Sequence, residues 1–293
     1  MRLFAHDRFT YPLPEGHRFP RARYRMLRQI LEADSRFSVQ EAEGVTDDDL
    51  LLAHGPHYLG RVVGGRLTQR ERRAVGLPWS PELVERGRRS VGATVAACRA
   101  ALQDGVAVNL GGGTHHAFPD SGRGYCTFND SVVAVRRLRA DGLIRRVLIV
   151  DLDVHQGDGT HTALGPDPGA VCMSVNGGAN HPVRRVPGDV EENLPDRSGD
   201  DRYLDTVGRL LRRALRSAHP DLCIYLAGAD PYEHDRLGRL SVTMGGLGER
   251  DLLVRSALDA AGIPVCVTLA GGYAERIEDT VAINVTTVSS FAR

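Results

Sequence analysis

The chain has 293 residues, of which 42% are hydrophobic and 25% are charged, a composition typical of a globular protein with a large core. Its 37 basic residues, all of them arginine, balance 37 acidic residues, which argues against a protein that binds nucleic-acid backbones or membrane surfaces. No apolar run reaches the ~18 residues of a transmembrane helix, the first residues lack a secretory-signal pattern, and the five cysteines form no CxxC pair. We therefore expect a protein of the reducing cytoplasm.

The first 80 residues show little regular periodicity. Residues 11–20, YPLPEGHRFP, are rich in turn formers and are expected to form a surface loop. Helical spacing follows at 21–33 and at 46–63. The second of these segments begins with Thr46 and three aspartates, which favour a helix N-terminus.

From residue 81 onward, short apolar runs alternate with helical patterns. The predicted strands are 105–110, 145–150, 169–175, 221–227 and 263–270. The predicted helices are 81–102, 131–142, 200–218 and 249–262. The strand segments are apolar at nearly every position, which is typical of parallel strands that are buried on both faces. The sequence therefore predicts a three-layer α/β fold, with a mainly parallel central sheet and helices on both faces.

Unusual polar residues follow the predicted strands. His115 and His116 come after the first strand, DLDVHQGDG (151–159) after the second, Asp230 after the fourth and Tyr273 after the fifth. Ligands of open parallel sheets bind outside the carboxyl ends of the strands, which meet at one edge. We therefore expect these side chains to form a single site.

The segment after the second strand carries candidate metal ligands. Asp153 and His155 are two positions apart, so both side chains can point the same way, and Asp230 is the best-placed third ligand. Two carboxylates, one imidazole and an open position suit catalytic Zn²⁺, although the same set accepts Fe²⁺. The alternative is that these aspartates cap helices. For Asp158 alone, capping is as good an explanation as a catalytic role. Capping explains the whole Asp-x-Asp-x-His-x-x-Asp string at 151–158 poorly, because unpaired buried carboxylates are costly.

The adjacent histidines suggest proton transfer. A histidine that acts as a base needs a carboxylate on its other ring nitrogen, and Asp151 and Asp158 supply one each for His115 and His116. A structural hydrogen-bonding role is the alternative for the two imidazoles. Tyr273 either packs against the sheet edge or directs its hydroxyl at a developing oxyanion.

The segments GGGTHHA, GYCTFND, DLDVHQGDGT, GADP and AGGY occur in this order and resemble the histone deacetylase family, whose fold is the arginase/deacetylase α/β fold. The resemblance covers nearly the whole chain, so we expect residues 1–293 to form a single deacetylase domain. PLPEGHRFP, GLPWSPEL and NLPDRSGDDRYL are similar to the class IV branch and its bacterial relatives. The resemblance implies a zinc-dependent hydrolase that acts on acyl-lysine amides.

The resemblance also implies a role for each site residue. The zinc ligands would be Asp153, His155 and Asp230. The catalytic residues would be His115, His116 and Tyr273, with Asp151 and Asp158 supporting the histidines and His116 as the general base. A potassium ion would be held by Asp151, Ser174 and the main-chain carbonyls of Asp153, His155 and Val175. The substrate channel would be lined by Gly124, Tyr125, Val186, Gly271 and Gly272.

The expected substrate is an acyl-lysine protein or peptide, with no nucleic-acid or membrane partner. Val186 stands before Pro187-Gly188, where family members often carry an aromatic residue, so a wider channel could also accept long fatty acyl groups. Three alternatives remain: hydrolysis of small acylated amines such as acetylated polyamines, a binuclear manganese ureohydrolase, and a non-catalytic acyl-lysine binding protein. The second needs bridging Asp/His ligands, such as an Asp-Ala-His-x-Asp string, that the sequence lacks.

Overall fold

The computed structural model describes residues 1–8 and 10–292, and within them eight parallel strands form one sheet. The strand order is β2-β1-β3-β8-β7-β4-β5-β6. The strands are β1 (Arg2–Ala5), β2 (Ser38–Glu41), β3 (Val106–Asn109), β4 (Val147–Asp151), β5 (Ala170–Gly177), β6 (Val190–Leu194), β7 (Leu222–Leu226) and β8 (Val265–Thr268). The predicted parallel α/β sheet is confirmed.

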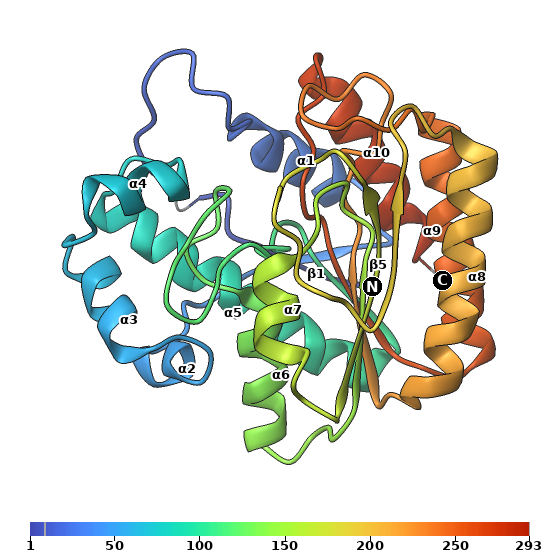
Figure 1. The fold of residues 1–293 in the computed structure, drawn as a ribbon, viewed down its shortest axis with the longest axis horizontal. Helices are drawn as coiled ribbons and strands as arrows, with labels where there is room; N and C mark the ends of the chain where they lie inside the picture. The colour runs from blue at the N-terminus through green and yellow to red at the C-terminus, as the bar shows by residue number, and fades with distance from the viewer. Residues whose placement is uncertain (9, 293) are drawn as a thin grey trace.

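Helices cover both faces of this sheet (Figure 1). In the described residues they are α1 (Ala22–Glu32), α2 (Asp47–Leu51), α3 (Pro56–Val63), α4 (Gln69–Val75), α5 (Pro81–Asp104), α6 (Asp130–Ala140), α7 (Asp158–Leu164), α8 (Asp200–Ala218), α9 (Met244–Ala260) and α10 (Ile277–Ser290). Helices α8, α9 and α10 lie on one face, and α5 and α6 lie on the other. The three-layer architecture follows directly.

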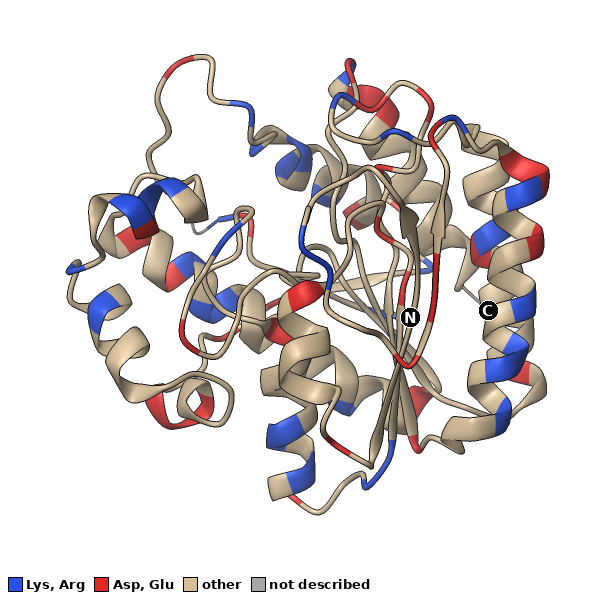
Figure 2. Ribbon diagram, viewed as in Figure 1, with Lys and Arg blue, Asp and Glu red and all other residues tan. Residues whose placement is uncertain are grey.

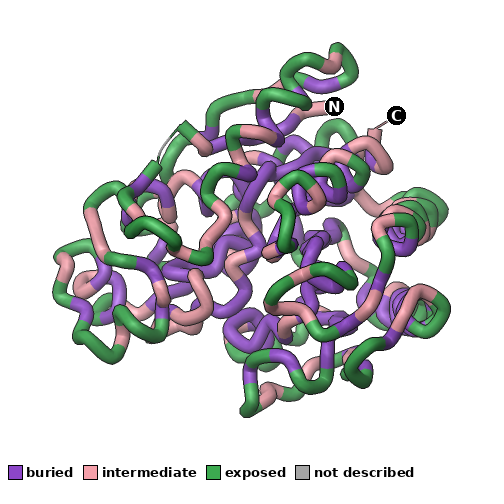
Figure 3. The backbone as a smooth tube through the Cα atoms, turned by 90° about the horizontal axis from the view of Figure 1, so that it is seen from above, coloured by how far each residue is buried: buried purple, intermediate pink, exposed green. Residues whose placement is uncertain are grey.

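Strand β4 shows how the sequence builds the two cores. Its side chains alternate between the faces of the sheet, because successive residues of a strand point in opposite directions. Leu148 and Val150 belong to the core under α8 and α9, whereas Val147 and Ile149 belong to the core under α5 and α6. A central strand must therefore be apolar throughout, and Figure 3 shows the buried chain concentrated in the interior.

The segment at 46–63 is two helices, not the single helix predicted. Thr46 is the N-cap of α2, as predicted, and its side chain accepts a hydrogen bond from the main-chain N–H of Asp49. Helix α3 begins anew at Pro56, whose ring is compatible with the first turn of a helix but not with its interior. The proline therefore separates two short helices that share one hydrophobic pattern.

Strands β1, β2 and β6 and helices α4, α7 and α10 were not predicted. The three strands lack the continuous apolar run of the predicted strands, since β2 (SVQE) and β6 (VEENL) are mostly polar and β1 (RLFA) begins with arginine; β2 is also largely exposed at the sheet edge. Helix α10 is rich in valine, isoleucine and threonine, which disfavour a helix on local propensity alone.

In the part of the chain that the structure describes, no helix is long and apolar enough to span a membrane.

Candidate active site

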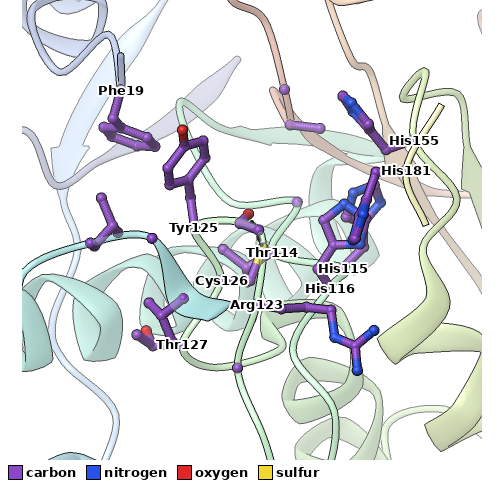
Figure 4. A pocket seen from close by; sticks show the side chains of 18 of the residues that line it. Phe19, Thr114, His115, His116, Arg123, Tyr125, Cys126, Thr127, His155 and His181 are labelled. Carbon is purple, nitrogen blue, oxygen red and sulfur yellow. Dashed lines mark hydrogen bonds between the residues drawn. The ribbon is translucent and has the colours of Figure 1, made fainter. Parts of the chain in front are cut away.

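A cavity of about 890 Å³ is lined by segments that follow β3, β4, β7 and β8. The predicted site residues that line it are His115, His116, Gly124, Tyr125, Asp153, His155, Asp230, Gly271 and Tyr273. Figure 4 shows the imidazoles of His115, His116, His155 and His181 gathered on one side, with the rings of Phe19 and Tyr125 on the other. The parallel strands thus bring distant parts of the sequence to one edge of the sheet.

The three predicted metal ligands come together in this cavity. One ligand atom from each of Asp153, His155 and Asp230 lies within 4.8 Å of the others. His155 Nδ1 is 3.0 Å from Asp153 Oδ1 and 3.3 Å from Asp230 Oδ2. Because β4 and β7 are neighbours, the loops after them bring both carboxylates to the same ring nitrogen, Nδ1 of His155.

The chemistry of these side chains fits a divalent cation. Asp230 is fully buried, and its Oδ2 atom, although 3.3 Å from His155 Nδ1, makes no well-aligned hydrogen bond with any described residue. Burial and the nearby Asp153 carboxylate raise the pKa of Asp230. A Cβ atom at Gly271 would collide with both carboxylates, so the glycine keeps space open beside them. Buried carboxylates are costly unless they are paired or coordinate a metal, and a cation here would satisfy them.

Two histidine–carboxylate pairs lie beside the predicted metal ligands. His115 Nδ1 is 2.7 Å from Asp151 Oδ2, and His116 Nδ1 is 2.8 Å from Asp158 Oδ1. All four side chains are buried, and the two imidazole centroids are 4.3 Å apart. Each carboxylate accepts a hydrogen bond from the protonated Nδ1 of its histidine. Nε2 of each ring is then the atom able to exchange a proton with a substrate.

The two imidazoles have opposite electrostatic environments. Burial, reinforced by His115, lowers the pKa of His116 to about 3. Burial also opposes charge on His115, but the carboxylates of Asp151 and Asp153 outweigh it and raise the pKa of His115 to about 9. His116 is therefore neutral near pH 7 and has the free lone pair that a general base requires.

Asp158 lies at the start of α7 but does not cap it, because the N-cap residue is Gly157 and no side chain makes a capping hydrogen bond there. It is the first residue of α7, where a carboxylate is favourable near the helix N-terminus, and it also accepts the hydrogen bond from His116. The Arg123 guanidinium approaches its other oxygen at 3.3 Å. The start of the helix therefore fixes the position of the carboxylate that orients His116.

Tyr273 lines the same cavity on a rigidly held turn. Its main-chain N–H donates to Asp235 Oδ2 at 2.5 Å, and Arg23 donates to the carbonyls of Ala270 at 2.7 Å and Gly272 at 2.9 Å. Burial raises the pKa of Tyr273 well above its ordinary value, so its hydroxyl stays protonated and able to donate. Sequence reasoning missed Arg23 and Asp235, because their role depends entirely on tertiary contacts.

Gly124 and Tyr125 form a wall next to His116. Both residues have positive φ, at 55° and 66°, and a Cβ atom at Gly124 would contact the His116 ring. The Tyr125 ring centroid lies 5.4 Å from that of Phe19 and 5.8 Å from that of Tyr273. The predicted channel residues on this side are thus part of an aromatic surface that leads to the metal ligands.

The opposite wall differs from the sequence prediction. Val186 does not line the cavity; its main-chain N–H and carbonyl bond the side-chain amide of Gln156 at 3.0 and 2.8 Å. His181 lines the cavity instead, with its ring centroid 5.1 Å from that of His116. Arg185 folds the loop back by donating to three carbonyls of residues 177–180, which brings His181 rather than Val186 to the wall. Gly272 is also absent from the lining, because its carbonyl faces Arg23.

The side chains predicted for potassium lie on adjacent strands. Asp151 of β4 is directly opposite Ser174 of β5, and both are buried. Ser174 Oγ accepts a hydrogen bond from Asn176 Nδ2 at 2.9 Å. The main chains of Asp153, His155 and Val175 continue from the same two strands.

A second group could also satisfy a metal, since ligand atoms of His116, Asp158 and His181 lie within 4.8 Å of one another. Two features weigh against it. The Asp158 carboxylate is already engaged by His116 and Arg123, and His181 is exposed. The triad of Asp153, His155 and Asp230 is more enclosed and contains the buried oxygen without a hydrogen-bond partner.

Fold and site together define a parallel α/β protein with a triad of candidate metal ligands beside paired histidines. Residues 17–288 match the model of the histone deacetylase domain. The chain is 40% identical to an uncharacterized protein of Picosynechococcus sp., over 94% of this chain and 93% of the other, and 31% identical to histone deacetylase 2 of Arabidopsis thaliana, over 82% and 65%. The crystal structure of a histone deacetylase homologue from Aquifex aeolicus has the same fold, with a TM-score of 0.85, 22% identity and coverage of 100% and 84%.

The chain belongs to the histone deacetylase family. Its sheet, all parallel in the described residues, and the likeness to the Aquifex aeolicus homologue confirm the arginase/deacetylase fold expected from the sequence.

Proposed function

We propose that this protein is a zinc-dependent hydrolase that removes acyl groups from lysine side chains, with residues 1–293 as one class IV-like domain. The observation that carries the proposal is the convergence of Asp153, His155 and Asp230 on one buried point. That point shares its cavity with His116, a neutral imidazole whose Nδ1 is already bonded to a carboxylate. The combination suits activation of a water for attack on an amide.

Asp153, His155 and Asp230 would hold the zinc ion, and the same donors would accept Fe²⁺. When bound, such an ion supplies Lewis-acid polarisation of a carbonyl and a lowered pKa for water. Asp151, Ser174 and the main-chain carbonyls of Asp153, His155 and Val175 would hold potassium below it. Both ions are part of the proposal. It is supported by the burial of the side-chain oxygens of Asp151, Ser174 and Asp230.

The side chains divide the remaining chemistry. His116 Nε2 accepts the proton of the attacking water, while Asp158 keeps its Nδ1 protonated and its ring in place. Tyr273 donates its hydroxyl to the acyl oxygen as negative charge develops there. His116, with His115 beside it, then returns a proton to the leaving amine as the carbon–nitrogen bond breaks.

The channel supports acyl groups of more than one length. Its aromatic wall, formed by Phe19, Tyr125 and Tyr273, provides apolar contact along the path to the metal ligands. A cavity of about 890 Å³ exceeds what an acetyl group needs. Since Val186 lies outside the lining, the proposal of long-chain deacylation rests on this volume and on the class IV resemblance.

A panel of acetyl-, octanoyl- and myristoyl-lysine peptides, assayed with and without a zinc chelator, tests the proposed reaction. We expect hydrolysis that the chelator abolishes and added zinc restores. Turnover that persists in metal-free protein would contradict the proposal. Efficiency that stays flat or falls from acetyl to myristoyl would reject long-chain deacylation and leave the deacetylase proposal standing.

Small acylated amines are a second candidate substrate class, because the cavity accommodates them as well. The arginine-rich lining speaks against acetylated polyamines, whose remaining amines are cationic. A purely non-catalytic acyl-lysine binder would not need two buried histidine–carboxylate pairs.

We also propose a cytoplasmic location, supported by five free and buried cysteines.

A further inference from the structure

The mouth of the cavity carries an excess of positive charge. Apart from the metal ligands, the acidic lining residue is Glu71, whereas the arginines of the lining are Arg23, Arg70, Arg73, Arg86, Arg123 and Arg239. Arg23 and Arg86 are buried, and the other four are partly or fully exposed. We define these four, Arg70, Arg73, Arg123 and Arg239, as the arginine rim.

Two members of the arginine rim are already paired. Arg123 lies 3.3 Å from Asp158, and Arg239 donates to Asp196 at 2.8 Å. No carboxylate pairs with Arg70 or Arg73 in residues 1–8 and 10–292. Glu71, which stands between them in the sequence, is occupied by Arg61 at 2.7 Å and by the main-chain N–H of Thr68 at 2.7 Å.

Helix α4 directs Arg70 and Arg73 toward the cavity. Arg70, Arg73 and Ala74 line it with i, i+3 and i+4 spacing, which places them on one face of the helix. The carbonyls of Ala74 and Val75 accept hydrogen bonds from the main-chain N–H groups of residues 124 and 125, at 3.0 and 2.8 Å. The helix is therefore fastened to the channel wall, and Figure 2 shows the basic residues along it in blue.

Two guanidinium groups without carboxylate partners, carried by an anchored helix at the mouth of a channel, have a clear chemical preference. Guanidinium forks match carboxylates and form bidentate hydrogen bonds with them. An acylated lysine is neutral, so it passes the rim without penalty, whereas the product lysine is cationic and is repelled. Cationic residues beside the acyl-lysine would meet the same repulsion.

We propose that the arginine rim, and Arg70 with Arg73 above all, binds carboxylates that flank the acylated lysine, so that the preferred substrates are acidic peptides. This inference rests on the proposed deacylase function and names its substrate class. The carboxylate could instead belong to a small molecule such as free Nε-acetyllysine, and the experiment below separates the two sources.

The test uses three peptides with the same acyl-lysine and with acidic, neutral or basic flanking residues, together with free Nε-acetyllysine. We expect kcat/KM to be highest for the acidic peptide, lower for the neutral peptide and lowest for the basic peptide. The difference should lie in KM, with kcat nearly unchanged. The preference should shrink when salt is raised from ~0.05 M to ~0.5 M, because exposed charges are screened. A small-molecule source is indicated if free Nε-acetyllysine matches the acidic peptide, and that result overturns the peptide assignment.

The variant Arg70→Gln/Arg73→Gln should lower the acidic-to-neutral ratio of kcat/KM by about threefold to tenfold, the range for two exposed ion pairs. Arg213→Gln/Arg216→Gln is the matched control, because it removes two exposed charges from α8 outside the cavity lining. It should retain the wild-type ratio. Equal ratios in the two double variants, or a wild-type preference for basic peptides, would overturn the inference.

Fluorescence anisotropy with the same labelled peptides separates this inference from the proposed reaction, because binding needs no turnover. Acidic preference in binding without hydrolysis would uphold the arginine rim and reject the deacylase proposal. Hydrolysis with no dependence on flanking charge would uphold the deacylase proposal and reject the role of the arginine rim.

Discussion

At the scale of single residues, the buried Asp230 carboxylate most directly implies a metal. Its Oδ2 atom has no hydrogen-bond partner among the described residues, and its Oδ1 atom accepts from the Val154 N–H at 2.9 Å. Asp230→Ala should remove the bound metal, which elemental analysis of purified protein measures. Asp196→Ala, at an exposed aspartate, is the control and should keep it. Full metal content in Asp230→Ala would show that the ligand set is wrong.

Tyr273 tests the chemistry rather than the metal. Tyr273→Phe removes one donor to the developing oxyanion, and such a loss typically lowers turnover by about 10²–10³. Metal content should stay at the wild-type level, because the hydroxyl is no ligand in the proposed site. Near-normal kcat in this variant would remove Tyr273 from the mechanism.

Gly271 is required for space rather than for a backbone conformation. A Cβ atom there would overlap the carboxylates of Asp153 and Asp230, so Gly271→Ala should lower metal affinity and turnover together. Gly245→Ala provides the comparison, since its nearest contact would be an ordinary 3.5 Å approach to Thr243. Equal zinc affinity in the two variants, measured by competition with a chelating dye, would argue against a crowded metal site.

At the scale of elements, a buried polar cluster supports the loop that carries Asp230. Asp251 of α9 bonds Tyr225 of β7 at 2.5 Å, Thr287 of α10 at 2.6 Å and Arg250 at 2.9 Å. Arg250 in turn donates to the carbonyl of Gly228 at 2.6 Å, two residues before Asp230. These hydrogen bonds thereby link the two helices to the loop that carries Asp230.

Asp251→Ala should destabilise the fold by about 3–5 kcal/mol, because it leaves the fully buried Arg250 guanidinium without its carboxylate. Urea unfolding measures the loss. Asp34→Ala, which breaks an exposed pair with Arg36, should leave the unfolding midpoint close to that of the wild type. A similar midpoint for both variants would mean that the cluster does not stabilise the protein.

The elements also show which features of the fold the sequence predicts. The five central strands lie within a few residues of their predicted bounds, since burial on both faces leaves a continuous apolar signal. Strand β2 gives no such signal because it is short and lies at the sheet edge. His181 was missed for a different reason: the path of a loop held by Arg185 brings it to the cavity, and no periodicity encodes that path.

At the scale of the whole molecule, the site is a consequence of strand order. β4 and β7 are neighbours, so the segments after them meet. β8 lies on the other side of β7, and β3 lies beside β8. The candidate metal ligands, the histidine pair and Tyr273 therefore reach one cavity from four loops. Motif and strand-end position predicted this convergence, whereas the residues that hold the loops, such as Arg23 and Asp235, required the three-dimensional contacts.

The most direct test of the account is a zinc titration of metal-free protein, followed by hydrolysis of an acyl-lysine peptide. The triad of Asp153, His155 and Asp230 predicts activity that rises in proportion to added zinc and levels off at about one ion per chain. Full activity before any metal is added, or a plateau that requires two ions per chain, would contradict it.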